Sequence, residues 1–276
     1  MEKMRITLHN HHSFVLDRSS LVRVFGFPAT LIHFDTLVLD RWFWVKKRLP
    51  RTRNGERIID IGSGAGAFTI GAARRGYTAL GLSWDAETLG VAAERARLCD
   101  ARNTVFELFD IRRLGERKDL SESFEVAVCL ETVEHILDDR KLLSDIGRVL
   151  VPGGFLLLTT PNHYYRAITL GDDGPFLHEE TGWHVRRGYT PSMLLELCEA
   201  SGFMIPEISY CSGFFSQKIT WLIRNLSNLH WLLAWFVVLP LRIVPPLLDP
   251  VVRKISGWAD YSICIVAQKP RFRKPE

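Results

Sequence analysis

The chain has 276 residues, with 35 Lys and Arg against 31 Asp and Glu and a formal net charge of +4. This length suits one large domain or a domain with a cap, and it can bury a substantial core. The balanced charge, without a long basic run, argues against a nucleic-acid partner. Five scattered cysteines without C-x-x-C spacing predict neither a disulfide framework nor a zinc site. We therefore expect a reducing, cytoplasmic compartment, and the charged first residues, which contain no apolar run, predict no secretory signal.

The first 50 residues are predicted to form an N-terminal helical segment. Apolar residues recur every three to four positions from Pro28 to Leu49, and Pro50 follows, which predicts one helix over that range. We expect Trp42 and Trp44 to be buried in preference to forming an aromatic substrate box. Three histidines precede this helix, but their spacing does not fit one helical face and no cysteine or carboxylate accompanies them, so no metal site is predicted (His9, His11, His12).

A glycine-rich turn between a strand and a helix follows in the stretch Arg57 to Asp85. Branched apolar residues run into glycines at alternate positions, and a helical pattern begins near Phe68 (Ile58, Ile59, Ile61; Gly62, Gly64, Gly66). Glycines let the backbone approach a ligand closely, and the amides at the start of the helix point toward whatever is bound. The pattern predicts a nucleotide-like cofactor.

Two kinds of cofactor compete for this loop. Gly62, Gly64 and Ala67 also satisfy the G-x-G-x-x-[GA] dinucleotide fingerprint. Asp60 would place negative charge near a pyrophosphate, however, whereas a cationic ligand tolerates it. Dinucleotide binders also carry an acid at the end of the next strand, where this chain has Ser83 and reaches an acid only at Asp85. These two features favour a cationic cofactor over NAD.

Strands and helices then alternate, which predicts a parallel sheet. The predicted elements in chain order are a helix 68–75, a strand 78–82, a helix 87–98, and strands 105–109 and 124–130. Ligands of such sheets bind beyond the carboxyl ends of the strands. Candidate ligand contacts at that edge are Asp60, Ser83, Asp85, Asp110, Ile111, Leu130 and Glu131.

The rest of the domain continues the alternation. We expect a helix 138–150, a turn over Val151–Gly154, a strand 155–160, a helix 192–201 capped by Thr190, and strands 206–211 and 261–268. The predicted cofactor domain thus comprises residues 51–211 and 261–270. A polar, aromatic loop containing His184 and Tyr189 follows the fifth strand.

The run D-I-G-S-G-A-G resembles motif I of class I S-adenosylmethionine-dependent methyltransferases. The later runs E-T-V-E-H-I-L-D-D and R-V-L-V-P-G-G-F-L-L-L-T-T-P-N are similar to the ubiquinone-biosynthesis type of small-molecule methyltransferase. The resemblance covers Arg57 to Asn162, with weaker support to Phe203. It implies S-adenosylmethionine as cofactor and a doubly wound, seven-stranded, mostly parallel α/β sheet of Rossmann-like type, in which the last two strands form an antiparallel hairpin.

The resemblance also assigns roles to residues at matching positions. The methionine and ribose pocket would be shaped by Asp60, Gly62, Gly64 and Gly66. The usual acidic ribose position is occupied by Ser83, which Trp84 follows. The adenine edge corresponds to Asp110 and Ile111, and the turn after the fourth strand to Glu131. Ser83 departs from the pattern, since one hydroxyl cannot accept from both ribose hydroxyls as a carboxylate does, and Asp85 is the candidate replacement. For Asp110 the alternative of a helix N-cap stays open.

Methyl transfer needs alignment of donor, carbon and acceptor, and a hydroxyl acceptor also benefits from a base. His135, His163 and His184 are the candidates for this base, with a structural, hydrogen-bonded histidine as the alternative for each. We expect His184 and Tyr189 to face the acceptor from the loop after the fifth strand. The candidate catalytic residues are therefore His135, His184 and Tyr189, and no metal is predicted.

Residues 212–260 form an unexpectedly long insertion between the last two strands. The stretch Asn225 to Leu241 has no charged residue and includes W-L-L-A-W-F-V-V-L, but its polar start and the prolines after it argue against a membrane-spanning helix. We expect helices that lie on a membrane, cover a greasy acceptor or form a dimer surface.

The function predicted from these features is S-adenosylmethionine-dependent methyl transfer to a small-molecule or lipid-like acceptor, by a cytoplasmic protein that contacts the membrane peripherally. An NAD-dependent oxidoreductase on the same fold and a non-catalytic membrane- or partner-binding module are the alternatives. Nucleic-acid methylation is not predicted, because Pro161-Asn162 differs from the N-P-P-Y loop used on flipped adenines.

Overall fold

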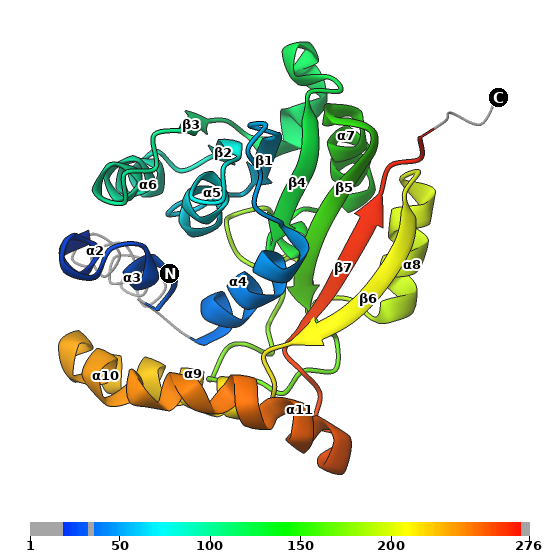
Figure 1. Cartoon of the computed structure of the whole chain (residues 1–276). Coiled ribbons are helices and arrows are strands. Elements are labelled where there is room, and N and C mark those ends of the chain that lie inside the picture. Colours follow the sequence, from blue (N-terminus) through cyan, green and yellow to red (C-terminus); the bar gives the residue numbers. More distant parts are fainter. Residues whose placement is uncertain (1–18, 33–35, 272–276) are drawn as a thin grey trace.

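The computed structural model describes residues 19–32 and 36–271, and a seven-stranded sheet forms its centre (Figure 1). The strand order is β3-β2-β1-β4-β5-β7-β6, and β7 is antiparallel to both of its neighbours. The strands are β1(Arg57–Ile61), β2(Thr78–Ser83), β3(Thr104–Leu108), β4(Phe124–Leu130), β5(Leu150–Pro161), β6(Met204–Cys211) and β7(Ser262–Gln268). The predicted doubly wound α/β fold is confirmed.

Helices cover both faces of the sheet. On one face lie α2(Ser19–Phe25), α3(Phe27–Leu31), α4(Thr36–Arg48), α5(Ala67–Ala73) and α6(Ala86–Leu98). On the other lie η1(Ile111–Glu116), η2(Lys118–Leu120), η3(Val133–His135), α7(Asp139–Val149) and α8(Pro191–Ala200). Each face has its own apolar core, and alternate residues of the same strand serve the two cores: Ile59 packs on the α7 and α8 side, Ile58 on the α4 and α5 side.

The predicted helix 28–49 is two helices in the structure. Helix α3 ends at Leu31 and α4 begins at Thr36, while residues 33–35 lie outside the described part. The amide of Thr36 donates to Thr220 Oγ1 at 3.3 Å, and its own hydroxyl donates to Ser216 O at 2.7 Å. The start of α4 is therefore set by contacts with the insertion, which local periodicity could not predict. The histidines near the N-terminus also lie outside the described residues (His9, His11, His12).

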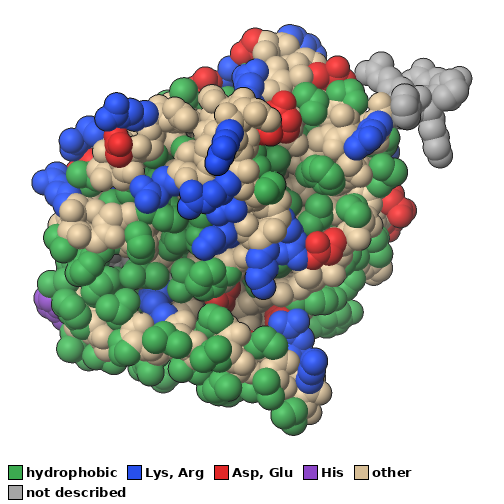
Figure 2. Space-filling view, in the orientation of Figure 1, with side chains coloured by type: hydrophobic (Ala, Val, Ile, Leu, Met, Phe, Trp, Pro, Cys, Tyr) green, Lys and Arg blue, Asp and Glu red, His purple; other side chains and the backbone are tan. Residues whose placement is uncertain are grey.

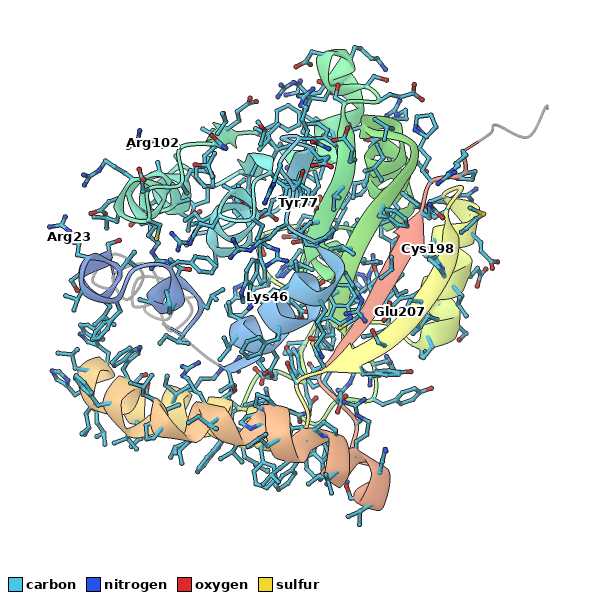
Figure 3. All side chains as sticks on the ribbon, in the orientation of Figure 1. Arg23, Lys46, Tyr77, Arg102, Cys198 and Glu207 are labelled. Carbon is cyan, nitrogen blue, oxygen red and sulfur yellow. The ribbon has the colours of Figure 1, made fainter. Side chains whose placement is uncertain are left out.

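Helix α4 packs the N-terminal segment against the sheet, as Trp42 and Trp44 predicted. Both indoles are buried, and Trp44 Nε1 donates to Ser209 Oγ on β6 at 2.8 Å. A Cβ on Gly71 of α5 would lie 2.3 Å from Trp42, so only glycine permits this contact. Arg48 at the end of α4 forms an ion pair with Glu207, which Figure 3 labels on β6.

The segment Val151–Gly154, predicted as a turn, belongs to β5. Leu150 pairs with Phe124, the pairing then shifts register, and Phe155 pairs with Val126. Gly153 has a φ of +84°, a conformation that favours glycine. The expected turn is thus an irregularity within one long strand.

The insertion between β6 and β7 is helical. It comprises α9(Phe214–Ser227), α10(Trp231–Val238), η4(Pro240–Ile243) and α11(Val244–Ser256). In Figure 1, α10 and α11 form a rod along the lower edge of the molecule. Helix α9 packs against α4, α10 and α11, and so connects this rod to the body of the protein.

Candidate active site

A cavity of about 320 Å³ lies at the carboxyl ends of β1, β2 and β4. The parallel strands end at this common edge, so residues far apart in the sequence meet there. Eight of the ten predicted cofactor residues line the cavity, namely Gly62, Gly64, Ser83, Trp84, Asp85, Asp110, Ile111 and Glu131. Asp60 and Gly66 are the two that do not.

The glycines of the loop after β1 serve different purposes. All three have positive φ. A Cβ on Gly62 would lie 2.5 Å from Thr132 Oγ1, and one on Gly66 would lie 2.8 Å from Ala92 Cβ, so both allow close packing. A Cβ on Gly64 would meet nothing within 4 Å, and Gly64 lines the cavity. Gly64 is therefore the position where an added side chain would enter the ligand's space.

Asp60 lies behind the loop. Its side chain is buried and its carboxylate accepts a hydrogen bond from Thr69 Oγ1 at 2.6 Å. Burial raises the pKa of Asp60 to about 6, although the bond from Thr69 opposes the rise. The contact joins β1 to α5, so Asp60 supports the loop from behind. Its predicted part in shaping the methionine and ribose pocket stays a prediction.

Ser83 and Asp85 form the next part of the cavity wall. The amide of Asp85 donates to Ser83 Oγ at 3.3 Å, and the Asp85 carboxylate caps α6 by accepting from the amides of Glu87 and Thr88. Because each carboxylate oxygen has a further lone pair, Asp85 can cap the helix and still accept from a ligand. Its role as the replacement ribose acid stays a prediction.

Asp110 combines the two interpretations left open by the sequence. Its carboxylate accepts from the amide of Arg112 at 3.1 Å, as an N-cap does, and it also lines the cavity. The Arg112 guanidinium bonds both carboxylate oxygens, which lowers the pKa of Asp110. Arg112 also bonds Glu180 at 2.7 Å, and so ties the loop after β5 to the rim of the cavity.

Glu131 stands where β4 ends. It has a φ of +49°, which is strained for a residue other than glycine. Its side chain is held by hydroxyl donors from two neighbouring strands, Thr159 Oγ1 at 2.9 Å and Ser262 Oγ at 3.0 Å. Arg41 of α4 approaches it at 3.4 Å. Three segments therefore fix the Glu131 carboxylate at the cavity wall.

A cluster of three titratable side chains lies beside this wall: Glu134, His135 and His184. The two imidazole rings meet edge to face with centroids 4.6 Å apart, and each Nε2 is 3.8 Å from Glu134 Oε1. The Glu134 side chain is fully buried; Oε2 accepts from Thr160 Oγ1, whereas Oε1 accepts no hydrogen bond from any described residue. His135 lines the cavity itself.

Burial determines the charge state of the cluster. Burial lowers the pKa of His135. Burial and the charge of His135 together lower the pKa of His184 to about 4. Burial and the neighbouring Glu131 raise the pKa of Glu134. Both imidazoles are consequently neutral near pH 7, which is the form that accepts a proton or binds a metal ion.

The sequence prediction did not include Glu134 and expected no metal. In the structure, one ligand atom from each of Glu134, His135 and His184 lies within 4.8 Å of the others. The adjacent pair Glu134-His135 was visible in the run E-T-V-E-H, but nothing in the spacing connected it to His184. The amide of Val185 donates to Glu134 O at 3.0 Å, and this contact brings the loop across.

Tyr189 and His163 lie away from this cluster. The Tyr189 side chain is buried in the core, and its hydroxyl donates to Asp139 Oδ2 at 2.6 Å. His163 is exposed after the end of β5. The structure thus places His135 in the cavity wall and His184 against His135. Tyr189 instead anchors its loop to α7, in contrast to the predicted acceptor contact.

Comparison with known proteins agrees with this geometry. The methyltransferase-domain family matches residues 39–207. The ubiquinone biosynthesis O-methyltransferase of Aeromonas salmonicida is 27% identical over 159 residues, which are 56% of this chain and 66% of that protein. The enzyme of the same name from Actinobacillus pleuropneumoniae serotype 5b is 26% identical over 63% of this chain and 76% of its own length. The matched part of the chain therefore spans about two thirds of the first relative and about three quarters of the second.

Among solved structures, phosphoethanolamine N-methyltransferase 2 of Haemonchus contortus in complex with S-adenosyl-L-methionine has a TM-score of 0.57 at 20% identity, covering 83% of this chain and 52% of that one. At this identity the likeness concerns the fold. The family match spans more than half of the chain and includes the glycine loop, the cavity wall and the Glu134–His135 pair. The chain belongs to the methyltransferase-domain family and is a class I S-adenosylmethionine-dependent methyltransferase, as its sequence motifs predicted.

Proposed function

We propose that the protein transfers a methyl group from S-adenosylmethionine to an oxygen of a small, apolar acceptor. The observation that carries this proposal is the Glu134, His135 and His184 cluster beside the cofactor cavity. A hydroxyl acceptor must lose its proton, and the cluster offers neutral imidazoles and a buried carboxylate. The O-methyltransferase relatives support oxygen as the methylated atom.

The lining of the cavity supports one orientation of the cofactor. Asp110 and Ile111 would hold the adenine, and Ser83 and Asp85 would hold the ribose, so the methionine end would lie toward Gly62 and Glu131. His135 lines this same end of the cavity. An acceptor bound over the cluster would then face the methyl group, and displacement in line with the carbon–sulfur bond needs mainly that alignment.

We further infer that the cluster binds a divalent cation. A neutral imidazole with a pKa near 4 is a weak base at pH 7, yet it remains a good metal ligand. Glu134 Oε1, which accepts no hydrogen bond from a described residue, fits the same role, because a bound cation would offset the cost of keeping this buried carboxyl group ionised. A bound cation would lower the pKa of the acceptor hydroxyl. Glu134, His135 and His184 would hold it.

The acceptor is proposed to be lipid-like and reached at a membrane, with the protein on the cytoplasmic side. The support is the rod α10–η4–α11 of the insertion, which exposes apolar side chains such as Phe236, Ile243 and Leu247. A dimer surface and a lid over the acceptor are the alternatives for this segment, and neither of them predicts binding to anionic vesicles.

A labelled-methyl transfer assay tests the proposal. The protein would be incubated with methyl-labelled S-adenosylmethionine and fractionated polar or lipid extracts. We expect the label in the lipid fraction, in a product that carries the labelled methyl group on an ether oxygen. Label only in the polar fraction would contradict the lipid-like acceptor, and label on nitrogen or carbon would contradict O-methylation.

Calorimetry separates the two cofactor classes. We expect heat of binding for S-adenosylmethionine and for S-adenosylhomocysteine and none for NAD. Binding of NAD without binding of S-adenosylmethionine would favour the oxidoreductase alternative. Methyl transfer to any acceptor would exclude a non-catalytic module.

A further inference from the structure

The outer face of the α10–η4–α11 rod carries a continuous apolar stripe. Its exposed residues recur at intervals of three or four along the helical run (Leu233, Phe236, Pro240, Ile243, Leu247, Val251, Ile255). This spacing puts them on one side of the rod. The side chains other than Pro240 are each at least 49% exposed. Figure 2 shows hydrophobic side chains gathered along this lower edge of the molecule.

Packing fixes which side of the rod faces outward. Ala234, Trp235 and Val238 are buried, and Ala234 and Val238 form a cluster with Ile219 and Ile223 of α9. Trp235 Nε1 donates to Ile32 O at 3.1 Å. With this inner face held by the protein, the apolar stripe cannot turn inward to escape water.

Charge is absent from the exposed part of this surface. Residues 229–252 contain two charged side chains, Arg242 and Asp249, and both are buried. Beside the rod, Val24 and Phe25 of α2 are also exposed, and the Phe25 ring centroid lies 5.6 Å from that of the buried Trp235. Burying a large apolar surface is favourable in proportion to its area, so such a patch indicates a partner.

The charges that flank the stripe are basic. Asp249 is the one acidic residue between positions 214 and 259, whereas Lys218 and Lys254 are exposed and Arg253 is partly exposed while paired with Asp260. Figure 2 shows blue side chains at the lower right end of the rod. An apolar stripe with basic flanks complements a membrane surface that carries anionic headgroups.

The run Trp231–Ser256 is long and apolar enough to cross a membrane, with a mean hydropathy of 1.9 over its most apolar part. Its inner face, however, packs on α9, and prolines interrupt it at four positions (Pro240, Pro245, Pro246, Pro250). A spanning helix would need lipid on all sides and would carry the buried Arg242 and Asp249 into the bilayer. The geometry therefore favours a rod that lies in the plane of the interface.

We propose that the outer stripe of α10–η4–α11, with Phe25 of α2 beside it, seats the protein on an anionic lipid surface. A second copy of the chain fits less well, because the insertion exposes no acidic side chain that could pair with Lys218 or Lys254 of the other copy. This surface would bring the enzyme to a lipid-like acceptor, and in that respect the inference rests on the proposed function.

Co-sedimentation with vesicles tests this surface without any acceptor. The full chain would be mixed with vesicles of phosphatidylcholine alone and of phosphatidylcholine with phosphatidylglycerol. We expect binding that increases with the anionic lipid and falls with salt. The variant Phe236→Ser with Leu247→Ser should bind more than about tenfold more weakly, since one buried apolar side chain is worth about that factor.

A matched control carries Val105→Ser with Leu108→Ser, two exposed apolar residues on the edge strand β3. It should bind vesicles like the wild type, and both variants should bind S-adenosylmethionine normally, which shows that they fold. Equal loss in both variants, or vesicle binding unchanged in the first, would overturn the proposal. The proposal would also be overturned if the wild type did not bind vesicles and instead formed a dimer that the Phe236→Ser and Leu247→Ser variant dissociated. Because no acceptor is present, none of these outcomes depends on the proposed methyl transfer.

Discussion

At the scale of single residues, Gly64 offers a direct test of the cofactor cavity. A Cβ there points into open space within the cavity wall, so Gly64→Val should block the ligand while leaving the core packing intact. The φ of +48° adds local strain, which for one residue costs about 1–3 kcal/mol. We expect calorimetric affinity for S-adenosylmethionine to fall by more than about tenfold. Gly90→Val in α6, also in open space, should not change it; unchanged affinity in the Gly64 variant would contradict the site.

The histidine cluster gives a second test at this scale. His184→Ala should lower the rate of methyl transfer by about 10²-fold or more if His184 holds a cation or a proton in the reaction. His163→Ala is the matched control, because His163 follows the same strand and is exposed. Treatment with a chelator should reduce the rate of the wild type, and added divalent cation should restore it. Full activity after chelation would contradict the proposed cation, and the imidazoles would then act as bases without a metal.

At the scale of elements, the contact between α4 and the insertion contains a partly buried acid, Asp40. Ser216 Oγ donates to Asp40 Oδ2, and Asp249 and Arg41 lie nearby. Burial raises the pKa of Asp40 to about 7, against an ordinary value of 3.8. The folded protein thus binds the proton more tightly than the unfolded chain does. The stability that this carboxyl contributes is full below its unfolded pKa and is lost as the pH rises through about 7.

Asp40→Asn should remove that dependence, because the amide carbonyl still accepts from Ser216 and carries no charge. We expect the melting temperature of the variant, relative to the wild type, to be higher at about pH 8 than at about pH 5. Asp100→Asn, at a site whose side chain is 75% exposed, should show no such trend. A difference that is constant with pH would contradict the assignment. The measurement is thermal unfolding by circular dichroism at several pH values.

The elements also explain which predictions could succeed. Strand and helix order followed from local patterns such as Ile58–Ile61 before the glycines, and eight cavity residues lay at strand ends where topology collects them. The break between α3 and α4 depends on Thr220 and Ser216, which are about 180 residues away. Glu134 and His184 meet only because a loop returns over β4. Such contacts between distant segments have no periodic signature in the sequence.

At the scale of the whole molecule, the insertion is a structural part of the fold as well as a surface. From the sequence we expect this segment to lie on a membrane, cover an acceptor or form a dimer surface. In the structure, Trp235 of α10 is only 1% exposed and belongs to the core on the α4 and α5 face of the sheet. Thr36 of α4 bonds both Ser216 and Thr220 of α9. The rod, α9 and the N-terminal helices therefore stabilise one another, and we expect insertion and sheet to unfold in one cooperative transition.

Two neighbouring residues separate these two roles of the rod. Trp235→Ala should destabilise the whole protein by about 3–5 kcal/mol, as expected for removal of a large buried ring. Phe236→Ala, at a position that is 60% exposed, should change stability by less than about 0.5 kcal/mol and yet weaken vesicle binding. Denaturant unfolding followed by far-ultraviolet circular dichroism measures both. If Trp235→Ala instead left the main unfolding transition in place and added a separate transition at lower denaturant concentration, the insertion would be an independent unit. A single transition at lower denaturant concentration would mean that the surface proposed to meet the membrane is built on the same core that supports the active site.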